Sequence, residues 1–142
     1  MLVNEELNEG VYAASGECFF LQNMWDPYNE YGTIHYKLGA NMNYDQAKMG
    51  HTNDNWTALA TVDNVTLDVK VLGTNIVCTS AVCANQDITI EGTTLTSDGA
   101  IIRIIIPGTS INATGGFDFQ LYVDSTTPAS IASVTVSCEH HF

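Results

Sequence analysis

Hydrophobic and polar residues alternate along several short stretches of the chain, the pattern of β-strands that bury one face. The clearest example is residues 65–72 (VTLDVKVL), in which Val or Leu occupies every second position. Residues 33–38, 117–123 and 131–138 show the same period of two. Each stretch is therefore predicted to form a strand with one side in the core and the other in solvent.

One stretch is more hydrophobic than the others. Residues 101–106 contain five isoleucines, interrupted only by Arg103, which predicts a strand buried on both faces. Pro107 and Gly108 end this strand, and a Gly-Gly pair at 115–116 precedes the strand at 117–123. We expect most of the core to pack on this pair of strands.

Shorter hydrophobic runs complete the set of expected strands, at residues 18–24, 56–62, 75–79 and 87–91, with 93–95 as a further candidate. Residues 39–55 are predicted to form a long polar loop, and residues 80–85 a short one. Eight to ten short strands, spaced about ten residues apart, are typical of all-β folds. The sequence thus predicts a single-domain antiparallel β-sandwich, with jelly-roll and immunoglobulin-like topologies both open.

The first 16 residues are expected to form an N-terminal arm, with the sandwich domain at 17–142. Glu5, Glu6 and Glu9 favour a short helix that Gly10 ends. An extended piece follows, and we expect it to insert as a donated strand into a neighbouring copy through Val11 and Ala13. Docking of the arm on its own sheet is the alternative.

The charge balance excludes some partners. Sixteen acidic residues face four basic ones, for a net charge of -12. Nucleic acids are excluded as partners because phosphate contacts require clustered Lys and Arg. Membrane insertion is not expected, since no apolar run reaches the ~18 residues of a spanning helix. The N-terminus also lacks the apolar run of a signal peptide, so export would need another route or a segment already removed.

Four cysteines in a β-rich chain with little Lys favour disulfides and an extracellular or cell-surface location. Of the three possible pairings, we expect Cys78–Cys83, a local link across a turn, and Cys18–Cys138, which joins the first sandwich strand to the last. The second closes nearly the whole chain, for which the loop-entropy model gives ~4–5 kcal/mol of stabilisation. The alternative is that all four thiols are reduced, with Cys138 in the core.

Aromatic residues gather near loops rich in Asp and Asn in the first 56 residues. Flat rings stack on sugar faces while carboxylates and amides bond the hydroxyl groups, so this composition is compatible with a carbohydrate platform. Its ring residues are Trp25, Tyr28, Tyr31 and Trp56. The alternative is that these rings cover an open end of the sandwich.

No cofactor is expected, because the Asp and Asn residues of the same loops are explained by turn formation. Calcium is the alternative, bound through Asp26, Asn29, Glu30 and Asp54, whose side-chain oxygens are the ligands it prefers. No sequence motif of a hydrolase, metalloprotease or nucleotide-binding enzyme is present, so no catalytic residue is predicted. His35 is expected to be isolated and exposed, and Asp118 and Asp124 to be solubilising charges.

These features favour a non-catalytic surface subunit with a structural or adhesive role, which self-associates through its N-terminal arm. A carbohydrate-binding module is the first alternative, and a surface protein that binds a host protein is the second. The expected partners are accordingly another copy of the chain, another protein or a glycan. A sandwich fold is compatible with all three roles.

Overall fold

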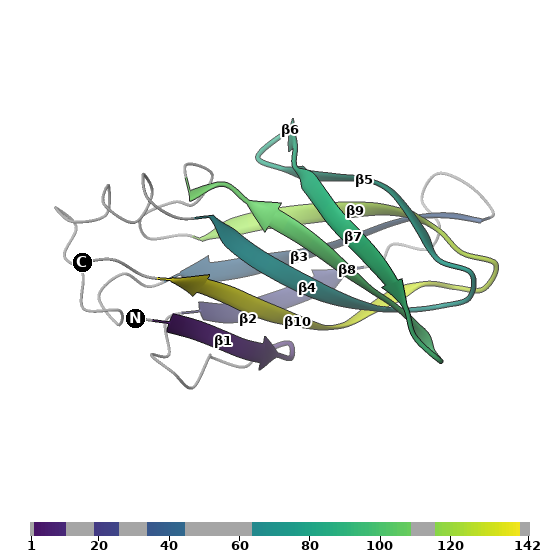
Figure 1. The fold of residues 1–142 in the computed structure, drawn as a ribbon, viewed down its shortest axis with the longest axis horizontal. Coiled ribbons are helices and arrows are strands. Elements are labelled where there is room, and N and C mark those ends of the chain that lie inside the picture. The colour runs from purple at the N-terminus through teal and green to yellow at the C-terminus, as the bar shows by residue number, and fades with distance from the viewer. Residues whose placement is uncertain (1, 11–18, 26–33, 45–63, 109–115, 140–142) are drawn as a thin grey trace, which may run out of the picture.

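The computed structural model describes residues 2–10, 19–25, 34–44, 64–108 and 116–139. These residues form ten strands and no helix, arranged as two antiparallel sheets of five strands that face each other (Figure 1), which confirms the predicted all-β sandwich. The first sheet contains, in spatial order, β1 (Leu2–Leu7), β10 (Ser130–Glu139), β4 (Val65–Leu72), β8 (Gly99–Ile106) and β7 (Thr89–Leu95). The second contains β2 (Phe19–Trp25), β3 (His35–Tyr44), β9 (Phe117–Asp124), β5 (Val77–Cys83) and β6 (Gln86–Asp87).

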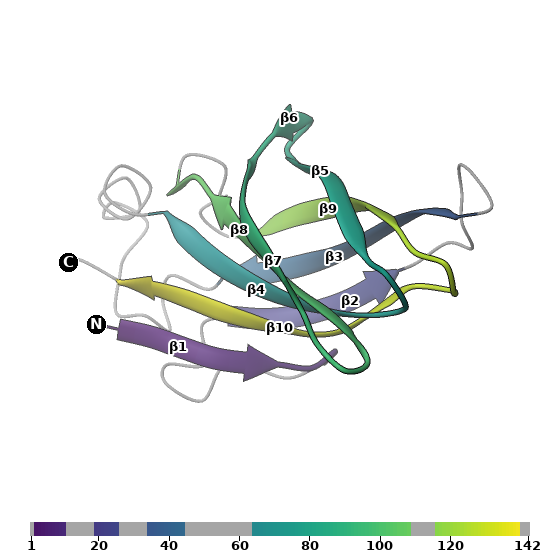
Figure 2. The ribbon, with the colours of Figure 1, turned by 45° about the vertical axis from the view of Figure 1, so that its right-hand side comes forward.

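The strand order is that of a jelly roll. β2 and β7 are outermost strands that pair with β3 and β8, their next neighbours in the chain. Without them, the other eight strands, counted in chain order, lie as 1-8-3-6 in one sheet and 2-7-4-5 in the other. This is the arrangement of two interlocked Greek keys. The molecule is thus a jelly roll with one added strand on each sheet (Figure 2).

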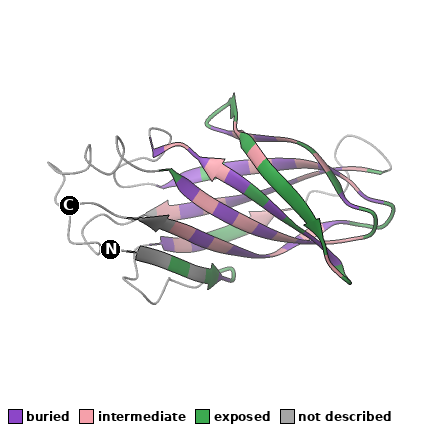
Figure 3. Cartoon of the chain, viewed as in Figure 1, coloured by how far each residue is buried: buried purple, intermediate pink, exposed green. Residues whose placement is uncertain are grey.

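The core lies between the sheets and follows the predicted alternation. In β4 the exposure pattern changes at every residue, with Leu67, Val69 and Val71 fully buried. β9 does the same, and Phe119 and Leu121 are fully buried beside Phe19 and the other large side chains of the core. Figure 3 shows these alternating buried and half-buried bands along the central strands.

β8 departs from its prediction, because it is not buried on both faces. Ile102, Ile104 and Ile106 are fully buried, but Ile101 is 37% exposed and Arg103 is exposed. β8 lies in one of two packed sheets, so one face of the strand packs on the other sheet and the opposite face meets solvent. Its additional isoleucines lie on the solvent face, beside Arg103. The run of β-branched residues therefore predicted the strand correctly, but the prediction that both of its faces are buried was wrong.

The N-terminal residues form a strand, so the predicted helix at Glu5–Glu9 is wrong. β1 pairs with β10 from Leu2 opposite Glu139 to Leu7 opposite Val134. Leu7 is 1% exposed and belongs to the core, so burial of this side chain accompanies strand pairing at the N-terminus. Val11 and Ala13 lie outside the described residues, so their insertion into a neighbouring copy stays a prediction.

β3 is longer than predicted, because residues 39–44 continue the strand instead of opening a polar loop. Ala40 and Met42 are fully buried and alternate with Gly39, Asn41 and Asn43 on the outer side. This is the same period of two that marks the other strands, masked by the Gly and Asn content. The predicted strand at 56–62 lies outside the described residues.

Candidate functional site

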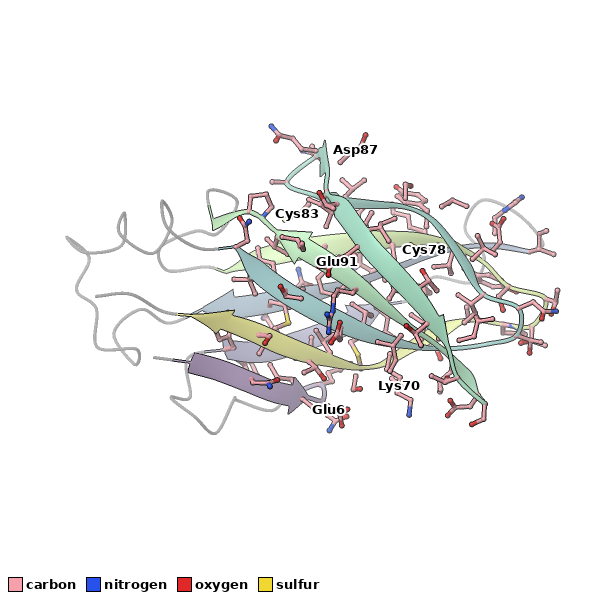
Figure 4. The ribbon with its side chains drawn as sticks, in the orientation of Figure 1. Glu6, Lys70, Cys78, Cys83, Asp87 and Glu91 are labelled. Atoms are coloured by element: carbon pink, nitrogen blue, oxygen red, sulfur yellow. The ribbon has the colours of Figure 1, made fainter. Side chains whose placement is uncertain are left out.

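The predicted disulfide between Cys78 and Cys83 is wrong. Both residues lie on β5, where residues 80–83 continue the strand instead of forming a loop. Five residues of extended chain separate their Cα atoms by ~16 Å, whereas a disulfide requires less than ~7 Å. Figure 4 shows the two side chains at separate places along the sandwich, and both thiols are free.

The two free thiols are held in their neutral form. Burial raises the pKa of Cys83 from 9.0 to about 11, and the charge of Asp118 acts in the same direction. Burial likewise raises the pKa of Cys78 to about 11, against a smaller opposing effect from a backbone hydrogen bond with Ser80. Both are therefore poor nucleophiles at neutral pH, since the thiolate is the reactive form. Cys138 lies opposite Val3 in the β10–β1 ladder, and Cys18 is outside the described residues, so their pairing stays a prediction.

Most of the residues predicted for loop sites lie outside the described residues. This holds for three of the four platform rings, Tyr28, Tyr31 and Trp56, and for the four predicted calcium ligands, Asp26, Asn29, Glu30 and Asp54. Within the part of the chain that the structure describes, no three His, Cys, Asp or Glu side chains form a group that could hold a metal ion.

Trp25, the remaining platform ring, lies on a glycine of the neighbouring strand. It ends β2 directly opposite Gly39 of β3. A Cβ atom added at Gly39 would lie 2.2 Å from the indole Cζ2, so the ring occupies the space that a side chain there would fill. The Lys37 ammonium lies 5.6 Å from the ring centroid, within the range of a cation–π interaction. Because Gly39 has no side chain, the indole can lie against the outer side of the sheet at this position.

The outer face of the second sheet, which carries this indole, contains ordered polar pairs between β3 and β9. His35 Nδ1 lies 2.6 Å from Asp124 Oδ1. Asn41 Nδ2 donates a hydrogen bond to Asp118 Oδ1. These polar groups, predicted to be isolated charges or an isolated histidine, are therefore paired across two strands. The partners are 89 and 77 positions apart in sequence, so only the register of the sheet brings them together.

Between these two pairs lie the remaining side chains of the same face. Tyr122 stands opposite Lys37, and Gln120 stands opposite Gly39. The Tyr122 hydroxyl donates to Gln120 Oε1 at 3.4 Å. Tyr122 and Gln120 were not singled out from the sequence, although their position between buried Phe119, Leu121 and Val123 marked them as outward-facing.

The edge strand β7 is the second candidate site. Its residues are exposed except for Ile90, which is half-buried and packs on the core. Leu95 is 65% exposed, although it lies opposite the buried Ala100 of β8. The facing sheet ends at this side in β6, which has only two residues, so it leaves the far end of β7 uncovered. Figure 3 shows β7 as an almost continuous exposed band.

The other three sheet edges differ from β7 in length, charge or cover. β6 is short, and β1 has the consecutive acids Glu5 and Glu6. On β2, the Leu21 carbonyl accepts a hydrogen bond from Gly10 N at 2.7 Å, and the Met24 amide donates to Glu9 Oε2 at 3.2 Å. Short length, charge and cover all protect edges against pairing. Residues 92–95 of β7 (GTTL) are exposed and uncharged, and no other described strand covers their free edge.

The outer face of the first sheet is an unpromising site for an anion. Arg103 Nε and Nη2 donate to the two carboxylate oxygens of Asp68 at 2.7 and 2.9 Å, and Nη1 lies 4.0 Å from Glu91. The open hollow beside them, of about 390 Å³, therefore presents a guanidinium already bound by carboxylates.

Comparison of the chain with known protein families, with curated proteins and with solved structures finds no match. The described residues include no helix that is long and apolar enough to cross a membrane.

Proposed function

We propose that this chain is a non-catalytic β-sandwich subunit with a structural or adhesive role outside the cell or at its surface, and that two copies associate through β7. The observation that carries the proposal is the uncovered, uncharged segment at residues 92–95 of that strand. Unpaired backbone groups on such an edge are a template for another strand. The absence of catalytic motifs from the sequence favours a role in binding or assembly.

A twofold axis through Thr94 gives the most favourable pairing. Antiparallel strands place residues of the same face opposite each other, so Leu95 of one copy would lie opposite Thr93 of the other. Glu91 would then meet Ser97 instead of another acid. The acidic chains, each of net charge -12, can approach here because the paired segment itself carries no charge.

The β-bulge that interrupts β7 between Ile90 and Gly92 limits the paired length. An interface of about four residues per copy is smaller than the ~1,200 Å² of a stable complex. We therefore expect a weak, concentration-dependent dimer. A twofold contact closes on itself, so larger assemblies would need a second contact, for which residues 11–13 are the predicted source.

Sedimentation velocity over a range of protein concentrations tests this proposal. The wild-type mass should rise from 15.4 kDa towards twice that value, whereas Leu95→Glu should remain at 15.4 kDa. The control is Val77→Glu, which places the same charge at a residue 57% exposed on the other sheet and should associate as the wild type does. A wild type that stays monomeric at every concentration, or a Leu95→Glu variant that still dimerises, would contradict the proposal.

The N-terminal segment is tested by substitution instead of deletion, because Leu7 belongs to the core. The second contact is tested by negative-stain electron microscopy, which shows whether regular assemblies form. The wild type is compared with a Val11→Glu, Ala13→Glu double variant. Loss of regular assemblies in the double variant, with dimerisation retained, would support the donated strand. Unchanged assemblies would show that the segment makes no such contact.

A further inference from the structure

We propose that the outer face of the second sheet binds a neutral oligosaccharide, with Trp25 and Tyr122 as the stacking rings and Gln120 and Asn41 as hydrogen-bonding groups. This site differs from the predicted loop platform in all but Trp25. It also lies on the sheet that does not contain β7, so it does not depend on the proposed self-association.

The first step of the argument is the placement of the two rings. Trp25 lies over Gly39, which keeps the indole close to the sheet instead of projecting into solvent. Tyr122 lies on β9, two strands away and one same-face position further along, opposite Lys37. Strand spacings of ~4.8 Å and a two-residue step of ~6.8 Å put the two Cα atoms ~12 Å apart. The indole extends over β3 towards β9, so the rings lie nearer to each other than the Cα atoms do, and both are on one sheet face where neighbouring units of one oligosaccharide could stack.

The second step is the polar lattice between and beside the rings. Sugar hydroxyls both donate and accept hydrogen bonds, so they need mixed groups held in fixed positions. The Asn41 amide is oriented by Asp118, and the Gln120 amide accepts from the Tyr122 hydroxyl. Each amide and carboxylate retains further donors or lone pairs for a ligand. Because these side chains are already ordered by their neighbours, binding would cost little additional side-chain entropy.

The third step is charge, which selects among ligand classes. On the described strands of this face Lys37 contributes +1, while Asp118, Asp124 and Asp87, the last reached from Gln120 through Val82 of β5, contribute -3. With His counted as neutral the formal sum is 1 - 3 = -2, on a chain that carries -12. Asn41 and His35 already engage two of the three carboxylates. The face therefore repels a polyanion and has few unpaired carboxylates for a basic peptide, whereas a neutral polyhydroxylated ligand requires no charge partner.

Screening on an array of neutral and sialylated glycans, followed by isothermal titration with the strongest neutral hit, tests the proposal. Trp25→Ala and Gln120→Ala should each weaken binding at least tenfold, while Tyr122→Phe, which keeps the ring, should retain most of it. Gly39→Val adds a second route, because its side chain would displace the indole without removing it. Leu95→Glu on the other sheet should bind as the wild type does.

Two results would overturn the proposal. One is a wild-type protein that retains no neutral glycan on the array. The other is binding that persists unchanged in the Trp25→Ala, Gln120→Ala double variant, which would place the ligand elsewhere. Circular dichroism of each variant verifies folding, and Gln120→Ala keeps the test decisive if removal of the indole unfolds the sheet. Since Leu95→Glu separates association from binding, failure of one proposal is distinguishable from failure of the other.

Discussion

Raising the pH from 8 to above 11 should destabilise the protein through its buried thiols, and Cys83 allows the size of the effect to be derived. Cys83 is 1% exposed, and its pKa rises from 9.0 to about 11 on burial. Below pH 9 the thiol is neutral in both folded and unfolded chains, so its contribution to stability is fully present. Between pH 9 and 11 the unfolded thiol ionises and the folded one does not. Two pH units at ~1.4 kcal/mol each give a loss of about 3 kcal/mol, complete above pH 11.

Urea denaturation at pH 8, 9, 10 and 11, with wild type and Cys83→Ala compared at each pH, isolates this contribution from the ionisation of tyrosines and lysines. The variant loses one buried sulfur atom, which should cost on the order of 1 kcal/mol at neutral pH. As the pH rises, the difference between the two proteins should shrink and then reverse in favour of the variant. The pKa of Cys78 is also raised to about 11, so Cys78→Ala should show the same trend. Parallel pH profiles for wild type and Cys83→Ala would refute the argument that desolvation holds this thiol neutral.

Two further predictions concern the backbone at Gly116 and the predicted disulfide between Cys18 and Cys138. Gly116 has a φ of +79°, and an added Cβ would lie 1.8 Å from the Met42 carbonyl oxygen, so Gly116→Ala should lower the free energy of unfolding by more than ~2 kcal/mol. Gly92→Ala, where nothing lies within 4 Å, should change it little, and equal effects in urea denaturation would contradict the reasoning. Thiol titration in guanidinium chloride without reductant should count two cysteines, Cys78 and Cys83, if Cys18 and Cys138 are paired. A count of four would reject that disulfide.

The sequence pattern predicted the fold where burial alternates at single residues. β4 was predicted with its observed ends, because Val or Leu at every second position leaves no other conformation that buries them all. β9 and β10 followed for the same reason. β3 was predicted too short, since Gly39, Asn41 and Asn43 disfavour strands by propensity while Ala40 and Met42 between them enter the core. Here tertiary burial outweighed local preference.

The cysteines illustrate a different failure. Cys78 and Cys83 are separated by a spacing that suits a loop link as well as a strand, and local sequence does not distinguish the two. The decisive feature is long-range: β5 pairs with β9, which places Cys83 opposite Phe119 and inside the core. A thiol so placed behaves as a small hydrophobic side chain. The even number of cysteines and their short spacing therefore predicted a Cys78–Cys83 disulfide that the strand geometry does not allow.

The polar pairs of the second sheet were beyond prediction for the same physical reason. Whether His35 meets Asp124 depends on the β3–β9 register, and a shift by one residue would send every outer side chain into the core. The sequence contained the chemistry of that face but no information about which groups are neighbours. Trp25 was recognised as a candidate ring, while the glycine beneath it acquires meaning only when β2 and β3 are aligned.

Both candidate surfaces arise from the strands added to the eight-stranded jelly roll. β2 brings Trp25 onto the outer face of the second sheet, and β7 supplies the open edge of the first. The six strands that lie between two others, β10, β4 and β8 in one sheet and β3, β9 and β5 in the other, must pair on both sides and bury alternate side chains. An outermost strand satisfies those constraints on one side only, so its remaining groups are available for a partner. The two added strands lie on different sheets, so a dimer formed through β7 would still present both outer faces of its second sheets, and a surface that carries many glycans could then engage two sites at once.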